Sequence, residues 1–72
     1  MKIDLLQKKI GNNIRIIKEA KGITQQDLAA IFNFEKGNLS RIEAGRTNPT
    51  ISSLFKISQA LEVTISELIK VE

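Results

Sequence analysis

Apolar side chains recur along this chain at steps of three and four residues, which is the period of one face of an α helix. The first such stripe consists of Ile3, Leu6, Ile10, Ile14 and Ile17. It predicts a helix from about Asp4, acting as N-cap, to Lys21, with Gly22 as the stop. The run Gly11-Asn12-Asn13 lowers helix propensity in the middle. Residues 4 to 10 are therefore either part of this helix or a separate turn.

A capping box marks the start of a second helix, because Thr24 is followed three residues later by Asp27. This helix covers residues 25 to about 32. Ala29 carries only a methyl group, which would let a crossing helix approach closely. Asn33 follows the end of the helix, and after glycine asparagine best tolerates the left-handed backbone that a tight corner needs.

A third helix follows directly after that corner. It spans about residues 36 to 44, with Glu35 as its N-cap and Gly45 as a left-handed stop. The apolar residues that fill the core around the corner are Leu28, Phe32, Phe34, Leu39 and Ile42. Two helices crossing through a tight turn form a helix-turn-helix, which places its second helix in the major groove of DNA. An ordinary helical hairpin would explain the core, but not the tight turn or the polar outer face.

Two further helices complete the pattern. Thr50, after Pro49, caps a helix over residues 51 to 61. Its apolar stripe is Ile51, Leu54, Ile57 and Leu61. Thr64 and Glu67 cap a short fifth helix. No strand-like alternation is evident, so we expect a compact all-α fold of five helices that forms one domain over the 72 residues.

The composition removes most enzyme chemistry. The sequence has no cysteine and no histidine, so it lacks disulfides, thiolate ligands, and the commonest general base and metal ligand. The carboxylates of Asp4, Asp27, Glu35 and Glu43 do not have the spacing of a catalytic site. We therefore expect no catalytic residue, no metal and no cofactor.

The length and hydropathy of the chain limit its partners. No apolar run approaches the about 20 residues of a membrane span, and the N-terminus lacks the apolar stretch and cleavage site of a secretory signal. We expect a cytoplasmic protein with no membrane partner. A chain of 72 residues has room for one core but not for a separate ligand-binding module, so we expect no small-molecule ligand.

Positive charge is concentrated in the first third of the chain. The net charge is +3, and residues 1 to 21 carry six Lys or Arg against two acidic residues. Residues 49 to 72 carry two basic and three acidic residues. This asymmetry gives weak support to a polyanionic partner.

Two stretches of the sequence carry a family resemblance. They are Thr24-Gln25-Gln26-Asp27-Leu28-Ala29 and Leu39-Ser40-Arg41-Ile42-Glu43-Ala44-Gly45-Arg46-Thr47-Asn48-Pro49. In these stretches the chain resembles the helix-turn-helix domain of phage Cro and CI repressors and their XRE-type bacterial relatives. The resemblance covers roughly residues 10 to 69. It implies a lambda-repressor-like DNA-binding fold whose helix-turn-helix lies at about residues 24 to 45.

The resemblance places the DNA-reading residues on the third helix. Positions that touch bases in such repressors hold Lys36, Gly37 and Arg41, with Asn38 and Ser40 beside them. Arginine matches the two acceptors of guanine, and asparagine can pair with adenine, so Arg41 is expected to read guanine. Gly37 departs from the polar residue usual in the family. Either its bare backbone lets the helix sit closer to DNA, or it is a weak spot that the core tolerates.

Phosphate contacts are expected from groups that flank the groove. Gln25 opens the second helix, where the backbone N–H groups and the helix dipole attract an anion. Arg46, Thr47 and Asn48 form the loop that in similar repressors lies along the sugar-phosphate backbone. Arg15 is either a phosphate contact or a surface residue.

Lys18 and Glu43 are expected to be structural. By resemblance they occupy positions that pair the first helix with the end of the third, usually as Arg with Glu. Lysine is a less directional partner than the planar guanidinium of arginine. A partly buried pair of this kind would orient the recognition helix.

One recognition helix reads only a few base pairs, so two copies of the chain on a two-fold operator are expected. The C-terminal part supplies the apolar candidates for the homodimer interface. These are Phe55, Ile65, Ile69 and Val71. For Ile65, as for the neighbouring Leu68, a place in the monomer core is the favoured interpretation.

The expected function is sequence-specific binding of double-stranded DNA by a homodimeric transcriptional regulator. It would act by occluding its operator or by touching RNA polymerase. The alternative is an antitoxin-like or adaptor protein whose main partner is another protein. An enzyme or nuclease subunit would need a nucleophile with its base, or a metal cluster, and the sequence offers neither.

Overall fold

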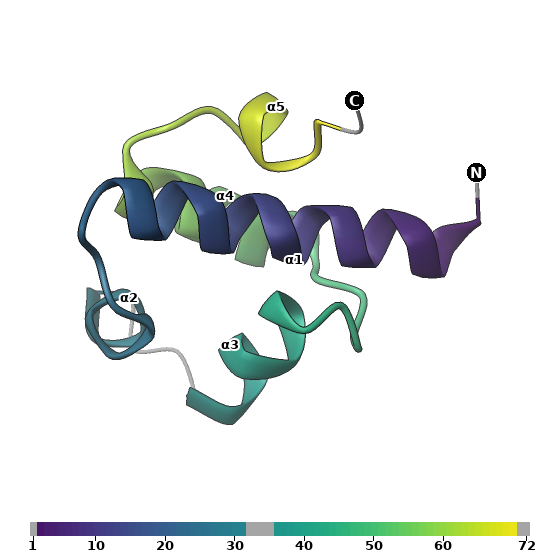
Figure 1. The fold of residues 1–72 in the computed structure, drawn as a ribbon, viewed down its shortest axis with the longest axis horizontal. Helices are drawn as coiled ribbons and strands as arrows, with labels where there is room; N and C mark the ends of the chain where they lie inside the picture. The colour runs from purple at the N-terminus through teal and green to yellow at the C-terminus, as the bar shows by residue number, and fades with distance from the viewer. Residues whose placement is uncertain (1, 32–35, 71–72) are drawn as a thin grey trace.

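The computed structural model describes residues 2–31 and 36–70, and this part of the chain is all-α. Its helices are joined by short connections (Figure 1). They are α1 (Ile3–Ala20), α2 (Gln25–Ile31), α3 (Lys36–Glu43), α4 (Ile51–Leu61) and α5 (Ile65–Leu68). The predicted all-α fold of five helices is confirmed. None of the helices in the described residues is long and apolar enough to cross a membrane.

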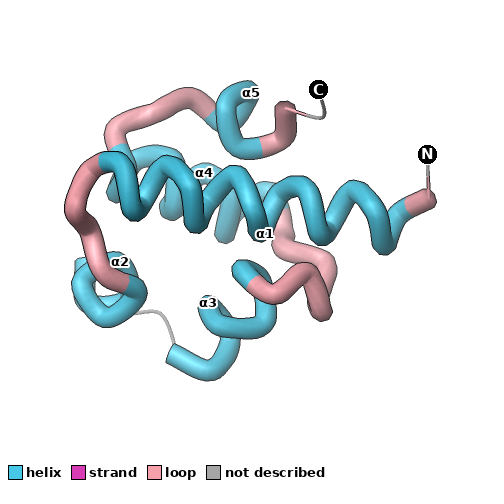
Figure 2. Tube along the Cα trace, viewed as in Figure 1, coloured by secondary structure: helices cyan, strands magenta, loops and turns pink. Residues whose placement is uncertain are grey.

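The long helix α1 is the scaffold of the molecule. It runs across the fold with α2 and α3 on one side, α5 on the other and α4 behind it (Figure 1 and Figure 2). α1 contacts α3 and α5, while α2 contacts α3 and α4. The pair of helices α2 and α3 therefore lies at one side of the molecule and is supported by α1 and α4.

Local capping signals set the starts of three helices. The Asp27 N–H donates to Thr24 Oγ1 (3.0 Å), and the Thr24 N–H donates to Asp27 Oδ2 (3.1 Å). This is the predicted capping box at the start of α2. Thr50 and Thr64 begin α4 and α5 in a similar way, each accepting the N–H of the residue three positions later. Each bond satisfies a backbone donor that the helix leaves unpaired.

The prediction of Asp4 as the N-cap of the first helix is wrong. α1 begins at Ile3, and Lys2 holds the N-cap position without a side-chain hydrogen bond. Asp4 lies inside the first turn, where a negative charge is favourable beside the positive end of the helix dipole. Its contribution to the start of α1 is electrostatic.

α1 continues without a break through Gly11, Asn12 and Asn13, so residues 4 to 10 are part of this helix. Asn13 has a tertiary partner. Its Nδ2 donates to the carbonyl oxygens of Leu68 and Lys70, both at 2.8 Å. Asn13 has a low helix propensity, but its two hydrogen bonds connect the C-terminal segment to α1.

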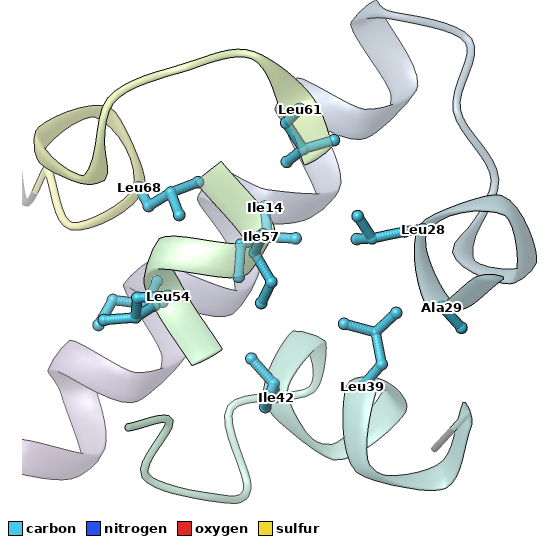
Figure 3. Packing of buried hydrophobic residues seen from close by; sticks show 10 residues of the cluster. Ile14, Leu28, Ala29, Leu39, Ile42, Leu54, Ile57, Leu61 and Leu68 are labelled. Atoms are coloured by element: carbon cyan, nitrogen blue, oxygen red, sulfur yellow. The ribbon is translucent and has the colours of Figure 1, made fainter. Parts of the chain in front are cut away.

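The core is aliphatic and lies between α1, α4 and the pair α2 and α3. Ile14 and Ile57 lie at its centre, and Leu28 and Leu39 point toward them (Figure 3). The buried hydrophobic residues are Ile10, Ile14, Leu28, Ala29, Leu39, Ile42, Leu54, Ile57, Leu61 and Leu68. The prediction that Leu28, Leu39 and Ile42 share a core is confirmed, while Phe32 and Phe34 lie outside the described residues.

Two residues assigned to apolar stripes do not reach the core. Ile3 is 58% exposed and Ile51 is 73% exposed. Both lie in the first turn of their helices, and the N-terminal end of α1 extends beyond the other helices (Figure 1). A stripe with the correct period is buried only where a second element covers it.

Candidate nucleic-acid interface

Helices α2 and α3 pack against each other through small and aliphatic side chains. Leu28 and Ala29 of α2 and Leu39 and Ile42 of α3 are all buried. Ala29, whose methyl group was expected to permit a close helix approach, is among these buried residues. The corner itself, residues 32–35 with Asn33 and Glu35, lies outside the described residues.

α3 turns its polar residues away from the core. Gly37, Ser40 and Arg41 are exposed, and Asn38 is half-buried. Lys36 is the first residue of α3, and its side chain lies outside what the structure describes. Of the predicted base-contacting residues, Gly37, Ser40 and Arg41 are thus accessible on α3 and Asn38 is partly accessible.

Arg41 is oriented along α3. Its Nε donates to the carbonyl oxygen of Gly37, one turn earlier, at 3.4 Å. A guanidinium has five N–H donors in a planar fork. The weak internal bond therefore leaves four of them for an external acceptor.

A buried ion pair connects α1 to the end of α3. Lys18 Nζ lies 2.6 Å from Glu43 Oε1, and both side chains are largely removed from solvent. The second oxygen of the same carboxylate, Glu43 Oε2, accepts from Gln25 Nε2 at 3.2 Å. Glu43 thus ties three helices together, α1 through Lys18 and α2 through Gln25. These two bonds link the end of α3 to α1 and to α2.

Gln25 is half-buried and partly committed to this network. A primary amide has two N–H donors and one carbonyl acceptor. The bond to Glu43 therefore uses one donor and leaves the second. The predicted phosphate contact of Gln25 stays a prediction, with the added feature that Glu43 orients the amide.

The chain leaves α3 through a Schellman motif at Gly45. Gly45 has φ of +74°, and its N–H and that of Arg46 donate to carbonyl oxygens of the last turn of α3, at 3.1 and 3.0 Å. The loop that follows exposes Arg46 and Asn48, while Thr47 is half-buried. The loop that carries these three predicted phosphate contacts thus begins at the hydrogen-bonded turn at the end of α3.

Arg15 lies on α1 and is exposed. Its Nη2 donates to Asn12 Oδ1, one turn earlier, at 3.2 Å. The side chain is accessible to a phosphate, and the alternative of a simple surface residue is equally compatible with this geometry.

The capping box also lowers the pKa of Asp27 in the first turn of α2. The backbone N–H of Thr24, and after it the Thr24 hydroxyl, hold the pKa of the Asp27 carboxyl below its usual value of 3.8. The described residues contain no group of three or more acidic side chains placed to hold a metal ion.

Sequence reasoning missed two close approaches of backbone that position the site. A Cβ atom on Gly11 would collide with the carbonyl oxygens of Glu43 and of Ile42 (2.6 Å), and one on Gly45 would lie 2.8 Å from Cα and Cγ of Lys8. The available signal was the glycine inside an otherwise regular helical stripe, which often marks a close contact.

The dimer candidates differ in accessibility. Phe55 and Ile69 are 50% and 41% exposed, whereas Leu68 is fully buried. Ile65 is half-buried, and Val71 lies outside the described residues. Phe55 and Ile69 are thus the candidates with accessible apolar surface.

The comparisons with known proteins agree with this geometry. Residues 14–68 match the HTH_3 family, described as helix-turn-helix. The chain belongs to this family. Its resemblance to the Cro and CI type of DNA-binding domain is thereby confirmed. The HTH_3 family is a family of transcriptional regulators and not of enzymes.

Individual relatives match most of the chain. It is 38% identical over 64 residues to the uncharacterized HTH-type transcriptional regulator y4dJ of Sinorhizobium fredii, a match that covers 89% of this chain and 83% of that protein. It is 41% identical over 64 residues to the HTH-type transcriptional regulator SlrR of Bacillus subtilis, covering 88% of this chain but 42% of SlrR. Antitoxin HipB of Escherichia coli is 28% identical over 57 residues, covering 79% and 65%. The chain thus spans less than half of SlrR.

A solved structure shows the same fold. The restriction-modification controller protein C.AhdI from Aeromonas hydrophila superposes with a TM-score of 0.82 at 27% identity, covering 86% of this chain and 94% of that one. The fold of this controller protein therefore matches 86% of the present chain.

Proposed function

We propose that this chain is a transcriptional regulator that binds a two-fold operator in double-stranded DNA as a homodimer, with α3 in the major groove. The observation that carries the proposal is the accessible polar side of α3, whose last residue, Glu43, is bonded to Lys18 of α1 and Gln25 of α2. A helix is about 10–12 Å in diameter with its side chains, and the major groove is about 12 Å wide. α3 therefore fits the groove as a rigid unit.

Base reading is assigned to the exposed side of α3. Arg41 donates to O6 and N7 of a guanine, for which its free N–H groups are suited. Asn38 and Lys36 read neighbouring bases, and Ser40 contributes a shorter donor or acceptor. Gly37 contributes no side chain, so its contact is a close approach of the backbone.

Phosphate binding is assigned to groups on either side of α3. Arg46, Thr47 and Asn48 follow the backbone from the loop after α3, and Gln25 contacts it from the start of α2. Arg15 extends this surface onto α1. These contacts set the position of α3 in the groove and carry no sequence information of their own.

The dimer interface is proposed to include the exposed side chains of Phe55 and Ile69, with Ile65 and Val71 as further candidates. These accessible apolar side chains would be removed from water in a symmetric contact. Binding of the dimer would regulate transcription in the cytoplasm, either by occluding a promoter or by contacting RNA polymerase.

The test begins with selection of bound sequences from a random duplex pool, followed by affinity measurements on the selected operator. Arg41→Ala should weaken binding by about 1–3 kcal/mol and relax the preference at one base pair. Arg46→Ala should weaken all sequences alike and reduce the salt slope by about one unit. An Arg41→Ala protein that lost affinity equally for every sequence would place Arg41 among the phosphate contacts.

A protein partner is the second candidate, favoured by the match to antitoxin HipB. It predicts that the chain elutes from its native lysate in a stoichiometric complex with one protein. Failure of the purified chain to prefer any duplex at low salt, together with such a complex, would replace the proposed function by this one.

A further inference from the structure

The part of α1 that precedes the family match is positively charged and lies beside the loop that follows α3. Residues 2–13 carry Lys2, Lys8 and Lys9 against Asp4, whereas the family match begins at residue 14. In Figure 1 the chain between α3 and α4 runs beneath this half of α1. The helix-turn-helix thus has a basic neighbour that the family match does not include.

Lys8 makes the closest contact with that loop. A Cβ atom placed on Gly45 would lie 2.8 Å from both Cα and Cγ of Lys8. The stem of Lys8 therefore packs directly on Gly45, the residue before Arg46. Lys8 is exposed. Within the described residues its ammonium group forms no salt bridge. Its ammonium group is available to a partner in solution.

Asn12 and Arg15 continue the surface along α1. Residues separated by three and four positions share one face of a helix, so Lys8, Asn12 and Arg15 lie in one row. All three are exposed. Gly11, beside this row, packs on the end of α3, which places the row at the α3 side of α1. Arg15 donates to Asn12 Oδ1, and this leaves the Nδ2 group of Asn12 for an oxygen acceptor.

The charges along the row fit a local anion. Asp4 and Glu19 lie one turn beyond its two ends, so the cationic stretch is limited to Lys8 through Arg15. DNA phosphates held by the Arg46 loop would bring their neighbours on the same strand to this stretch, because Lys8 packs against that loop.

We propose that Lys8 and Asn12 bind DNA phosphates next to those contacted by Arg46, so that α1 extends the backbone-binding surface beyond the helix-turn-helix. The proposal rests on the proposed function, since it assumes that α3 enters the major groove. Lys8 supplies a charge and Asn12 an amide N–H, and neither reads sequence.

The experiment compares the wild-type chain, Lys8→Gln and Lys70→Gln by fluorescence anisotropy on a labelled duplex of mixed sequence and on the selected operator. Lys70 is the matched control, because it is an exposed lysine that follows α5 in the sequence, and α5 lies on the opposite side of α1 from α3 (Figure 1). One lost phosphate contact lowers the salt slope by about 0.9, so the ratio of wild-type to Lys8→Gln affinity should fall about 3.5-fold between 50 and 200 mM salt. Lys70→Gln should keep the wild-type slope.

Asn12→Ala provides a second, independent measurement. It removes a neutral donor, so the affinity should fall on both duplexes while the salt slope stays unchanged. Glutamine at position 8 keeps most of the stem that packs on Gly45, and thermal melting checks that each variant is folded.

The proposal is overturned if Lys8→Gln retains the wild-type slope, or if Lys70→Gln lowers the slope as much as Lys8→Gln does. The second result would indicate a general effect of net charge. A wild-type chain that binds neither duplex would instead refute the proposed function.

Discussion

Gly11 and Gly37 show that the same residue type in a helix can have opposite consequences. Both lower the intrinsic stability of a helix. Gly11 faces the carbonyl oxygens of Ile42 and Glu43, so no Cβ fits there, whereas a Cβ at Gly37 would meet no atom of residues 2–31 and 36–70 within 4 Å. The first glycine is required by packing, whereas packing within the described part of the chain does not require the second.

Gly11→Ala should therefore destabilise the protein although alanine is the better helix former. Forcing α1 away from the end of α3 is an overpacking defect, which typically costs about 1–3 kcal/mol. Chemical denaturation of the variant measures the free energy of unfolding. An increase in stability would show that α1 and α3 can separate without cost.

Gly37→Ala is the matched control, because it makes the same chemical change where there is space. It should stabilise the fold by up to about 1 kcal/mol. Its effect on DNA affinity decides between the two interpretations of Gly37. A loss of affinity together with a gain in stability would indicate close approach of the backbone to DNA, and an unchanged affinity would indicate a tolerated weak spot.

At the scale of helices, Glu43 is the residue through which α3 is oriented. Glu43→Gln should lower the free energy of unfolding by about 1–3 kcal/mol, because the buried ammonium of Lys18 loses its charged partner. Urea unfolding of the variant gives this value. Gln25→Ala is the comparison, since it removes the weaker bond and leaves the ion pair, and it should cost less. Equal stability of wild type and Glu43→Gln would remove the structural assignment of the pair.

The start of α2 should lose in acid the part of its capping stabilisation that the Asp27 carboxylate supplies. The pKa of Asp27 is lowered in the folded chain, so its bonds to Thr24 stabilise the fold above the unfolded-state pKa and are lost as the pH falls through the lower, folded-state pKa. The difference in melting temperature between wild type and Asp27→Ala should therefore shrink below pH 3.8. If the difference in melting temperature between wild type and Asp27→Ala were the same at pH 7 as below pH 3.8, the charge of the carboxylate would not contribute to the cap of α2.

For the whole molecule, the proposed homodimer implies two-fold symmetry of the complex with DNA. Two copies related by a two-fold axis would place their α3 helices in successive major grooves, about 34 Å apart. Inserting about five base pairs between the half-sites turns one of them to the opposite face of the duplex, and binding should fall to the level of a single half-site. Undiminished binding to the lengthened operator would contradict the rigid dimer. Sedimentation of the Phe55→Ser variant would test whether Phe55 lies in the dimer interface.

Much of the fold was predictable because its signals are local. The capping threonines and the spacing of Leu54, Ile57 and Leu61 depend on neighbours within one or two turns, and the structure has the α4 helix at the predicted residues. That helix ends at the predicted residue, Leu61, although Glu62 rather than glycine takes the left-handed position, with φ of 58°. Exposure of Ile3 and Ile51 could not be predicted, since it depends on which helices cover them.

The sequence by itself determined which residues form helices, which side of each helix is apolar, and the family through the motif around residues 24 to 49. These properties follow from the 3.6-residue period and from side chains that bond to their own backbone. Only the tertiary structure decided that Gln25 shares Glu43 with Lys18, that Gly11 gives α3 its space, and that Lys8 lies against Gly45. Such contacts join residues far apart in the sequence, and their presence depends on the distance and angle between packed helices.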